Sequence, residues 1–89
     1  MFYVYVLRDP KSDKLYVGYS SDLRKRIKTH HTKGVKTTKH RDYGLIYYEA
    51  YIHRQDALGR EKFLKGGSGR KYLNKQLKNY FESSTNSKA

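Results

Sequence analysis

The sequence predicts an α/β fold of the α+β type, in which a small three-stranded antiparallel sheet is flanked by helices in the order ββαβαα. Three segments of bulky, alternating residues are typical of strands, and helical stretches introduced by capping residues separate and follow them. The length of 89 residues fits one domain, since chains usually divide only at much greater length. We expect this domain over residues 1–82, followed by a flexible polar tail over 83–89.

The first two strands form a predicted hairpin. Phe2 to Leu7 alternates bulky residues, and Leu15 to Tyr19 does the same. The segment from Asp9 to Asp13 between them has the composition of a turn. Gly44 to Ile52, rich in Tyr and Ile, predicts the third strand.

Apolar periodicity and capping residues predict three helices, over about Leu23–His31, Arg54–Lys65 and Gly69–Phe81. Residues 20–22 (Ser-Ser-Asp) offer N-cap side chains for the first helix. Gly66 and Gly67 are expected to end the second helix, and Ser68 to cap the third. The segment 32–43 has no periodicity and is interpreted as a basic loop.

Several classes of protein are excluded by composition. The chain has no cysteine, which removes disulfides, thiolate zinc sites and thiol nucleophiles, and its four histidines lack zinc spacing. The first apolar run, Phe2–Leu7, is too short for the core of a signal peptide or for a membrane span. We therefore expect no membrane association and a cytoplasmic location.

Net charge is the strongest functional signal. Twenty Lys and Arg against eight Asp and Glu give a formal net charge of +12, and such a domain repels itself unless a polyanion neutralises it. The stretch Arg24–Arg41 carries eight Lys or Arg and no acid. This pattern favours nucleic acid over a basic face that only aids solubility, and over an anionic membrane.

The predicted phosphate-binding residues lie in that stretch or at the start of the third helix, where backbone N–H groups also favour anions. They are Arg24, Lys25, Lys33, Lys36, Lys39, Arg41, Arg70 and Lys71.

Glu61 is a charged residue on the apolar face of the second predicted helix. Helical geometry places it between Leu58 and Leu64. A carboxylate aimed at a core is costly unless a cation meets it. Two interpretations stay open: a structural ion pair with a buried Arg, or a metal ligand or acid–base group.

The first helix has matching polar residues on its inner side. His30 lies between Leu23 and Ile27 in angle, and Arg26 lies at the edge of the same face. Arg26 and His30 are one turn apart and point the same way. A histidine alone is more often a packing residue, but an Arg beside it favours an anion site.

The predicted hairpin adds hydroxyl groups. Tyr3, Tyr5 and Leu7 share one face of the first strand, and Tyr16 and Gly18 share one face of the second. Each Tyr taken alone is an ordinary strand residue. Gly18 weakens a strand and indicates a close approach by a ligand or by backbone.

Four segments follow one another in a specific order and spacing: Tyr3-Val4-Tyr5, Tyr16-Val17-Gly18, Asp22-Leu23-Arg24-Lys25-Arg26 followed by His30, and Arg60 to Lys65. Together they resemble the GIY-YIG nuclease domain. That family includes the N-terminal nuclease of the bacterial excision-repair incision subunit, intron homing endonucleases and small stand-alone proteins. The resemblance covers roughly Phe2 to Phe81. The first motif has Tyr3 where the family has Gly, and Asn74 lies near the position of a family Asn.

The resemblance implies a role for each candidate residue. Tyr5 and Tyr16 match the tyrosines of the two motifs that line the site, and Arg26 matches the Arg that grips the scissile phosphate. His30 falls where relatives place a His or Tyr. Glu61 matches the carboxylate that binds one divalent ion, Mg²⁺ or Mn²⁺.

The expected function is therefore a Mg²⁺-dependent DNA endonuclease, acting on duplex or branched DNA in repair or recombination without a small-molecule cofactor. Phosphodiester hydrolysis needs an activated water and stabilisation of the charge that develops on phosphate. Tyr16, Tyr5 or His30 is the candidate general base. Because a free phenol has a pKa near about 10, a Tyr base needs a nearby cation.

Two other classes of function remain as alternatives. A non-catalytic nucleic-acid-binding module of the same fold would need the charge but not the complete set of candidate catalytic residues. A basic RNA-associated structural protein would explain the charge but not Glu61.

Overall fold

A computed structural model of the chain describes residues 1–32 and 43–88, and the side chains of residues 1–28 and 43–83. Its elements in chain order are β1 (Phe2–Arg8), β2 (Leu15–Ser20), α1 (Leu23–Thr32), β3 (Gly44–Tyr51), α2 (Arg54–Lys65), α3 (Gly67–Gln76) and α4 (Lys78–Lys88). The strands form one antiparallel sheet in the order β2-β1-β3. The predicted α+β class and the order ββαβαα are confirmed, with the last predicted helix divided into α3 and α4.

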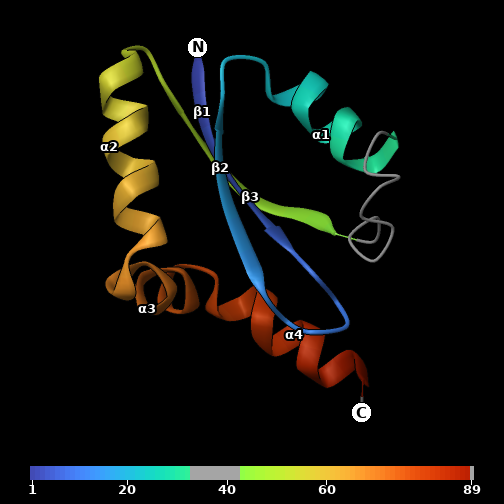
Figure 1. Cartoon of the computed structure of the whole chain (residues 1–89). Helices are drawn as coiled ribbons and strands as arrows, with labels where there is room; N and C mark the ends of the chain where they lie inside the picture. The colour runs from blue at the N-terminus through green and yellow to red at the C-terminus, as the bar shows by residue number, and fades with distance from the viewer. Residues whose placement is uncertain (33–42, 89) are drawn as a thin grey trace.

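Helices cover both faces of the sheet, and strand alternation decides which residues meet them. Val4 and Val6 are fully buried on one face, where they form the main core with three residues of α2 and α3: Ala57, Leu64 and Leu73. Tyr5 and Leu7 point to the other face, where they pack with Tyr43 and with two residues of α1, Leu23 and Ile27. Figure 1 shows α1 set apart from α2 and α3 in this layered arrangement.

The hairpin loop between β1 and β2 is held by the carboxylate of Asp9. Its two oxygens accept hydrogen bonds from the backbone N–H of Lys11 at 3.0 Å and from Ser12 Oγ at 2.7 Å. Asp13 has a φ of 64°, a left-handed conformation that Asp tolerates better than most residues. It also pairs with Arg8, at 2.6 Å between Oδ1 and Nη2. The predicted turn over Asp9 to Asp13 is therefore confirmed.

The first helix begins as predicted, because Asp22 Oδ1 accepts a hydrogen bond from the backbone N–H of Lys25 at 3.1 Å.

The predicted cap of the third helix is wrong. Gly66 is the N-cap of α3, with no side-chain hydrogen bond, and the helix already begins at Gly67. None of the helices in the described residues has the length and apolar character needed to cross a bilayer.

The junction of α2 and α3 explains this early start. Gly66 has a φ of −77°, so it ends α2 without the left-handed conformation expected of a glycine cap. Gly69 is the residue that the junction requires, because a β-carbon there would lie 1.9 Å from the carbonyl oxygen of Leu64. α3 therefore turns away from α2 within a very short connection.

The single helix predicted over Gly69–Phe81 is interrupted at Leu77, which has φ −107° and ψ 30°. α4 then extends to Lys88, through most of the segment for which the sequence predicts a flexible polar tail. Leu77 packs against the main core, so the break lies where the chain is anchored to the domain.

We expect Gly69→Ala to destabilise the protein. The added methyl group would meet the backbone of Leu64, and overpacking of this kind typically costs about 1–3 kcal/mol. Gly59→Ala is the matched control, since nothing lies within 4 Å of a β-carbon at that helical position. It should stabilise the protein by about 0.5–1 kcal/mol. Urea unfolding followed by circular dichroism measures both, and equal stabilities would contradict the close approach of α3 to Leu64.

Candidate functional site

Tyr5 and Gly18 are opposed across β1 and β2. In the same register Leu7 is opposite Tyr16, so both tyrosines lie on the face that α1 covers, as the alternation predicts. A β-carbon at Gly18 would lie 2.4 Å from Cζ and Oη of Tyr5. The predicted close approach at Gly18 is confirmed, but the approaching group is the Tyr5 ring rather than a ligand or backbone.

Charged residues from two helices act on the hydroxyl group of Tyr5. Arg26 of α1 forms a hydrogen bond with it, and Glu61 and Lys65 of α2 act on it electrostatically. Burial raises the pKa of Tyr5, and the charge and hydrogen bond of Arg26 offset only part of that rise. The phenol therefore keeps its proton at neutral pH. Because α1 and α2 cover opposite faces, charges from both sides of the sheet act on this phenol, whose ring lies over Gly18 of the edge strand β2.

Glu61 is paired with its own helix. Its Oε2 lies 3.0 Å from Nζ of Lys65, four residues further along α2, and the Glu61 side chain is 19% exposed. The sequence left open whether Glu61 is a structural partner of a buried Arg. That structural pair exists, but it joins Arg60 to Glu49, with Nε 2.8 Å from Oε1 and Nη2 3.0 Å from Oε2. This arrangement favours a chemical role for Glu61.

Glu49 is the centre of a network on the other face of the sheet. Tyr47 and Tyr51 donate hydrogen bonds to its two oxygens. Burial alone would raise the pKa of Glu49, but hydrogen bonds from Arg60, Tyr47 and Tyr51 lower it overall. Burial and the hydrogen bond to Glu49 raise the pKa of Tyr51 to about 12. The Arg60 guanidinium also lies 4.4 Å from the ring centroid of Tyr72. The sequence analysis missed this network, although the spacing Tyr-x-Glu-x-Tyr places the three strand residues on one face.

Tyr16 lies at the exposed side of the site. Its side chain is 39% exposed, and its ring centroid is 4.6 Å from that of Tyr43. Tyr43 is buried, and burial together with a hydrogen bond to Tyr16 raises its pKa. The sequence analysis did not single out Tyr43, because it ends a segment without periodicity. Lys65 was also missed, although its i,i+4 spacing from Glu61 predicts the pair.

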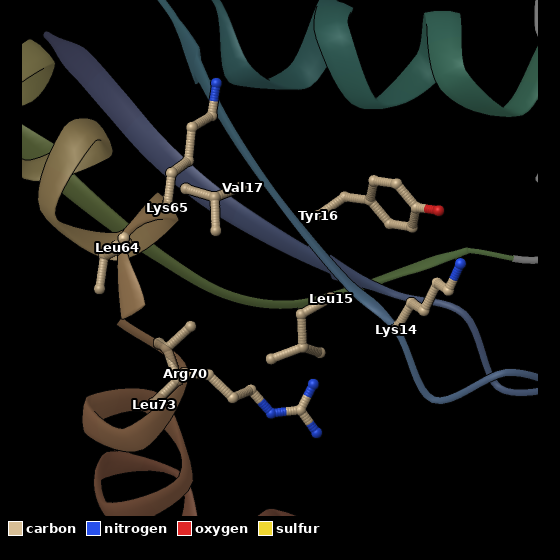
Figure 2. Close-up of a pocket in the computed structure, with 9 residues that line it drawn as sticks. Lys14, Leu15, Tyr16, Val17, Leu64, Lys65, Arg70 and Leu73 are labelled. Atoms are coloured by element: carbon tan, nitrogen blue, oxygen red, sulfur yellow. The ribbon is translucent and has the colours of Figure 1, made fainter. Parts of the chain in front are cut away.

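A groove of about 540 Å³ lies along β2, between that strand and the α2–α3 junction. Three of its lining residues are cationic: Lys14 of the hairpin loop just before β2, Lys65 at the end of α2 and Arg70 of α3. Figure 2 shows Lys14 extending to the same side of the strand as Tyr16. Leu15, Val17, Leu64, Gly66 and Leu73 form its apolar lining, and Tyr16 completes it. Lys65 and Tyr16 belong to both the groove and the candidate site, so the two are continuous.

The other predicted phosphate-binding residues are distributed over the surface. Arg24 and Lys25 are exposed on α1 and Lys71 is exposed on α3. Asn74 Oδ1 accepts a hydrogen bond from Arg70 Nε at 3.2 Å, which places Asn74 beside the groove lining. His30 belongs to α1, but its side chain lies outside the described residues, as do the predicted contacts Lys33, Lys36, Lys39 and Arg41.

The residues present fit a divalent cation. The described residues contain no cluster of three or more His, Cys, Asp or Glu side chains. Mg²⁺ does not require such a cluster, because it keeps several water ligands and is commonly held by one or two carboxylates together with substrate phosphates. Glu61 offers one partly exposed carboxylate, and its charge acts on Tyr5, to which Arg26 is hydrogen-bonded. This donor set suits a hard cation that binds along with a phosphate group.

Comparisons with known proteins show the family of the chain. The family model described as the GIY-YIG catalytic domain matches residues 1–76. A UPF0213 protein of Streptococcus pyogenes serotype M5 (strain Manfredo) is 42% identical over 66 residues, which cover 71% of this chain and 70% of that protein. A UPF0213 protein of serotype M3 (strain SSI-1) is 40% identical over 65 residues with the same coverage. No solved structure matches the chain. The family match runs from β1 to the end of α3 and includes Tyr5, Arg26 and Glu61.

The convergence on Tyr5 can be tested by titration. Arg26→Gln should raise the pKa of Tyr5 further, because it removes a positive charge and a hydrogen bond, whereas Glu61→Gln should lower it by removing a negative charge. The ¹³Cζ chemical shift of Tyr5 against pH measures both effects. Arg24→Gln, on the same helix as Arg26, is the control and should leave the titration nearly unchanged. Shifts of the same sign in the Arg26 and Glu61 variants would contradict the arrangement.

Proposed function

Because the chain belongs to the GIY-YIG family, we propose that it is a metal-dependent DNA endonuclease that hydrolyses phosphodiester bonds. The observation that carries this proposal is that Arg26 and Glu61, from helices on opposite faces of the sheet, both act on the Tyr5 hydroxyl. A cation, a neutral hydroxyl donor and a carboxylate that no Arg of the described residues pairs with are the groups that a phosphate diester and a divalent ion require.

Arg26 is the residue that neutralises the non-bridging phosphate oxygens. Its hydrogen bond to Tyr5 fixes the guanidinium before substrate binds, so little reorganisation is needed during the reaction. Tyr5, which keeps its proton, can donate a hydrogen bond to a phosphate oxygen. The close packing of its ring over Gly18 holds that hydroxyl in place.

Tyr16 is the proposed acceptor of the proton from water. Unlike Tyr5, which is 4% exposed, Tyr16 is 39% exposed and can reach solvent. The hydrogen bond and ring contact with Tyr43 orient its phenol. His30 is the second candidate for this role, since it follows Arg26 by one helical turn.

Glu61 is the residue that would hold the divalent ion. When bound, such an ion supplies Lewis-acid stabilisation of the charge that develops on the phosphate and on the leaving 3′ oxygen. Lys65 holds one oxygen of Glu61 through its ion pair and so orients the carboxylate. One ion fits this site, since Glu61 is the single carboxylate among the described groups that act on Tyr5.

Branched or damaged DNA in repair or recombination, in the cytoplasm, is the proposed setting for this activity. The alternative of a non-catalytic binding module explains the net charge of +12 but gives no role to Glu61. Incubation with duplex, nicked, flapped and four-way DNA, with and without Mg²⁺, separates the two functions. Cleavage that requires Mg²⁺ supports the nuclease, and binding without cleavage of any substrate supports the module.

Glu61→Gln should abolish Mg²⁺-dependent cleavage while DNA binding is retained or becomes tighter. The variant keeps the shape of the side chain and removes the charge that would bind the ion. Glu82→Gln is the matched control, because Glu82 is exposed on α4. Cleavage rates and binding affinity, measured for both variants, check this prediction. A Glu61→Gln protein that cuts at the native rate would show that Glu61 is only structural.

The identity of the general base can be tested by single-turnover cleavage against pH. Tyr16→Phe keeps the ring packed on Tyr43 but removes the proton acceptor, and loss of a positioned base typically lowers the rate by about 10²–10⁴-fold. The rate of the parent protein should rise with pH until the base is ionised, and this rise should disappear in Tyr16→Phe. Tyr5→Phe should retain it. If His30→Ala loses the rise and Tyr16→Phe keeps it, the base is His30.

A further inference from the structure

The groove beside β2 has a chemical character that cleavage of a phosphodiester does not itself require. Its rim carries Lys14, Lys65 and Arg70, which come from the hairpin loop before β2, from α2 and from α3. Its floor is apolar, with Leu15 and Val17 partly exposed above the buried Leu73. A site for phosphate alone needs the rim but not the floor. This combination suits a nucleotide: its anionic phosphate can meet the cations of the rim, and the less polar faces of its sugar and base can lie on the apolar floor.

The charges of the rim are only partly compensated. Lys65 is paired with Glu61, and Nη2 of Arg70 lies 3.9 Å from Oδ2 of Asp13. Asp13 is 56% exposed and already pairs with Arg8, so it neutralises Arg70 weakly. Lys14 is exposed, and none of the described residues forms an ion pair with its side chain. A surplus of positive charge therefore faces the groove.

The position of Arg70 is fixed in advance. Its Nε donates to Asn74 Oδ1 at 3.2 Å and its Nη1 donates to the backbone oxygen of Asp13 at 3.3 Å. The second bond ties α3 to the hairpin loop that carries Lys14. Figure 2 shows the Arg70 guanidinium turned toward the part of the groove between Leu15 and Lys14. These contacts hold the Arg70 guanidinium beside the hairpin loop that carries Lys14.

The size of the groove limits what can enter it. A volume of about 540 Å³ lies in the range of small-ligand pockets, about 300–1,000 Å³. It is large enough for one nucleotide, and a base can lie on the apolar floor only when it is not stacked within a duplex. Because the groove is continuous with the candidate site through Tyr16 and Lys65, its nucleotide belongs to the strand whose phosphate lies at Arg26.

We propose that this groove binds an unpaired nucleotide of the substrate strand, next to the scissile phosphate. Lys14 and Arg70 hold its phosphate, and its sugar and base lie over Leu15 and Val17. This inference rests on the proposed nuclease function and narrows its substrate class to DNA with an unpaired nucleotide at the cleavage position, such as a flap or a single-stranded branch. An uninterrupted duplex must first pay for unstacking a base, which costs a few kcal/mol.

The test compares binding of two fluorescent DNAs with equal numbers of phosphates, an uninterrupted duplex and a duplex with a short single-stranded flap. Binding is measured by anisotropy in EDTA, so that no cleavage occurs. The parent protein should prefer the flapped DNA. In Lys14→Gln/Arg70→Gln the preference should fall by about tenfold, the scale of a lost charge-assisted contact. The matched control, Lys62→Gln/Lys75→Gln, removes the same charge from exposed positions of α2 and α3 outside the groove and should keep the preference.

Arg70 contributes contacts to the fold, so Lys14→Gln alone is the second variant, since Lys14 is exposed and its removal breaks no ion pair among the described residues. It should lower the preference in the same direction. Equal binding of both DNAs by the parent protein, or a preference that survives in both groove variants, would overturn the proposal. A parent protein that prefers flapped DNA in EDTA but cuts nothing in Mg²⁺ would refute the nuclease function and leave the groove assignment standing.

Discussion

The packing of the Tyr5 ring over the backbone of Gly18 is the constraint on which the candidate site depends. A side chain at residue 18 would occupy the space of the Tyr5 hydroxyl, since even a β-carbon would lie 2.4 Å from it. With glycine there, the phenol reaches the outer edge of the sheet, where Arg26 from one helical layer and Glu61 from the other both act on it. If a side chain at residue 18 kept the Tyr5 phenol from this edge, the charges of α1 and α2 would remain on opposite sides of the sheet.

Glu49 and Glu61 have different roles in this small domain, the first in stability and the second in the proposed chemistry. Glu49 is held by Arg60 and two tyrosines, so its charge is satisfied within the protein and it ties β3 to α2. Among the described residues, Glu61 is paired only with its neighbour Lys65, whose side chain is 56% exposed. A charge compensated in this weaker way is available to an incoming cation. The structural ion pair with an Arg thus belongs to Glu49, and it is partly buried.

Cationic residues of the described part of the chain lie on both sides of the edge of β2. Arg26 lies on the α1 side of the strand, and the groove with Lys14 and Arg70 lies on the side of α2 and α3. Tyr16 and Lys65 connect the two. A strand of DNA that follows these charges would pass around the sheet edge. One of its bases would reach the apolar floor of the groove after leaving the stack of neighbouring bases. In this proposal the shape of the edge selects the substrate.

The local sequence pattern predicts the three strands, the first two helices and the pairing of Tyr16 with Gly18 on one strand face, because alternation, helical periodicity and capping are local properties. It also marked Arg26 and Glu61 as polar residues on apolar faces. It could not determine which carboxylate meets the Arg, that Tyr43 supports Tyr16, or that Gly69 lets α3 begin before Ser68. These depend on contacts between residues far apart in the chain, which only sheet register and helix packing decide. The groove beside β2 also depends on the tertiary structure, since the fold alone brings together its cationic residues from the hairpin loop, α2 and α3.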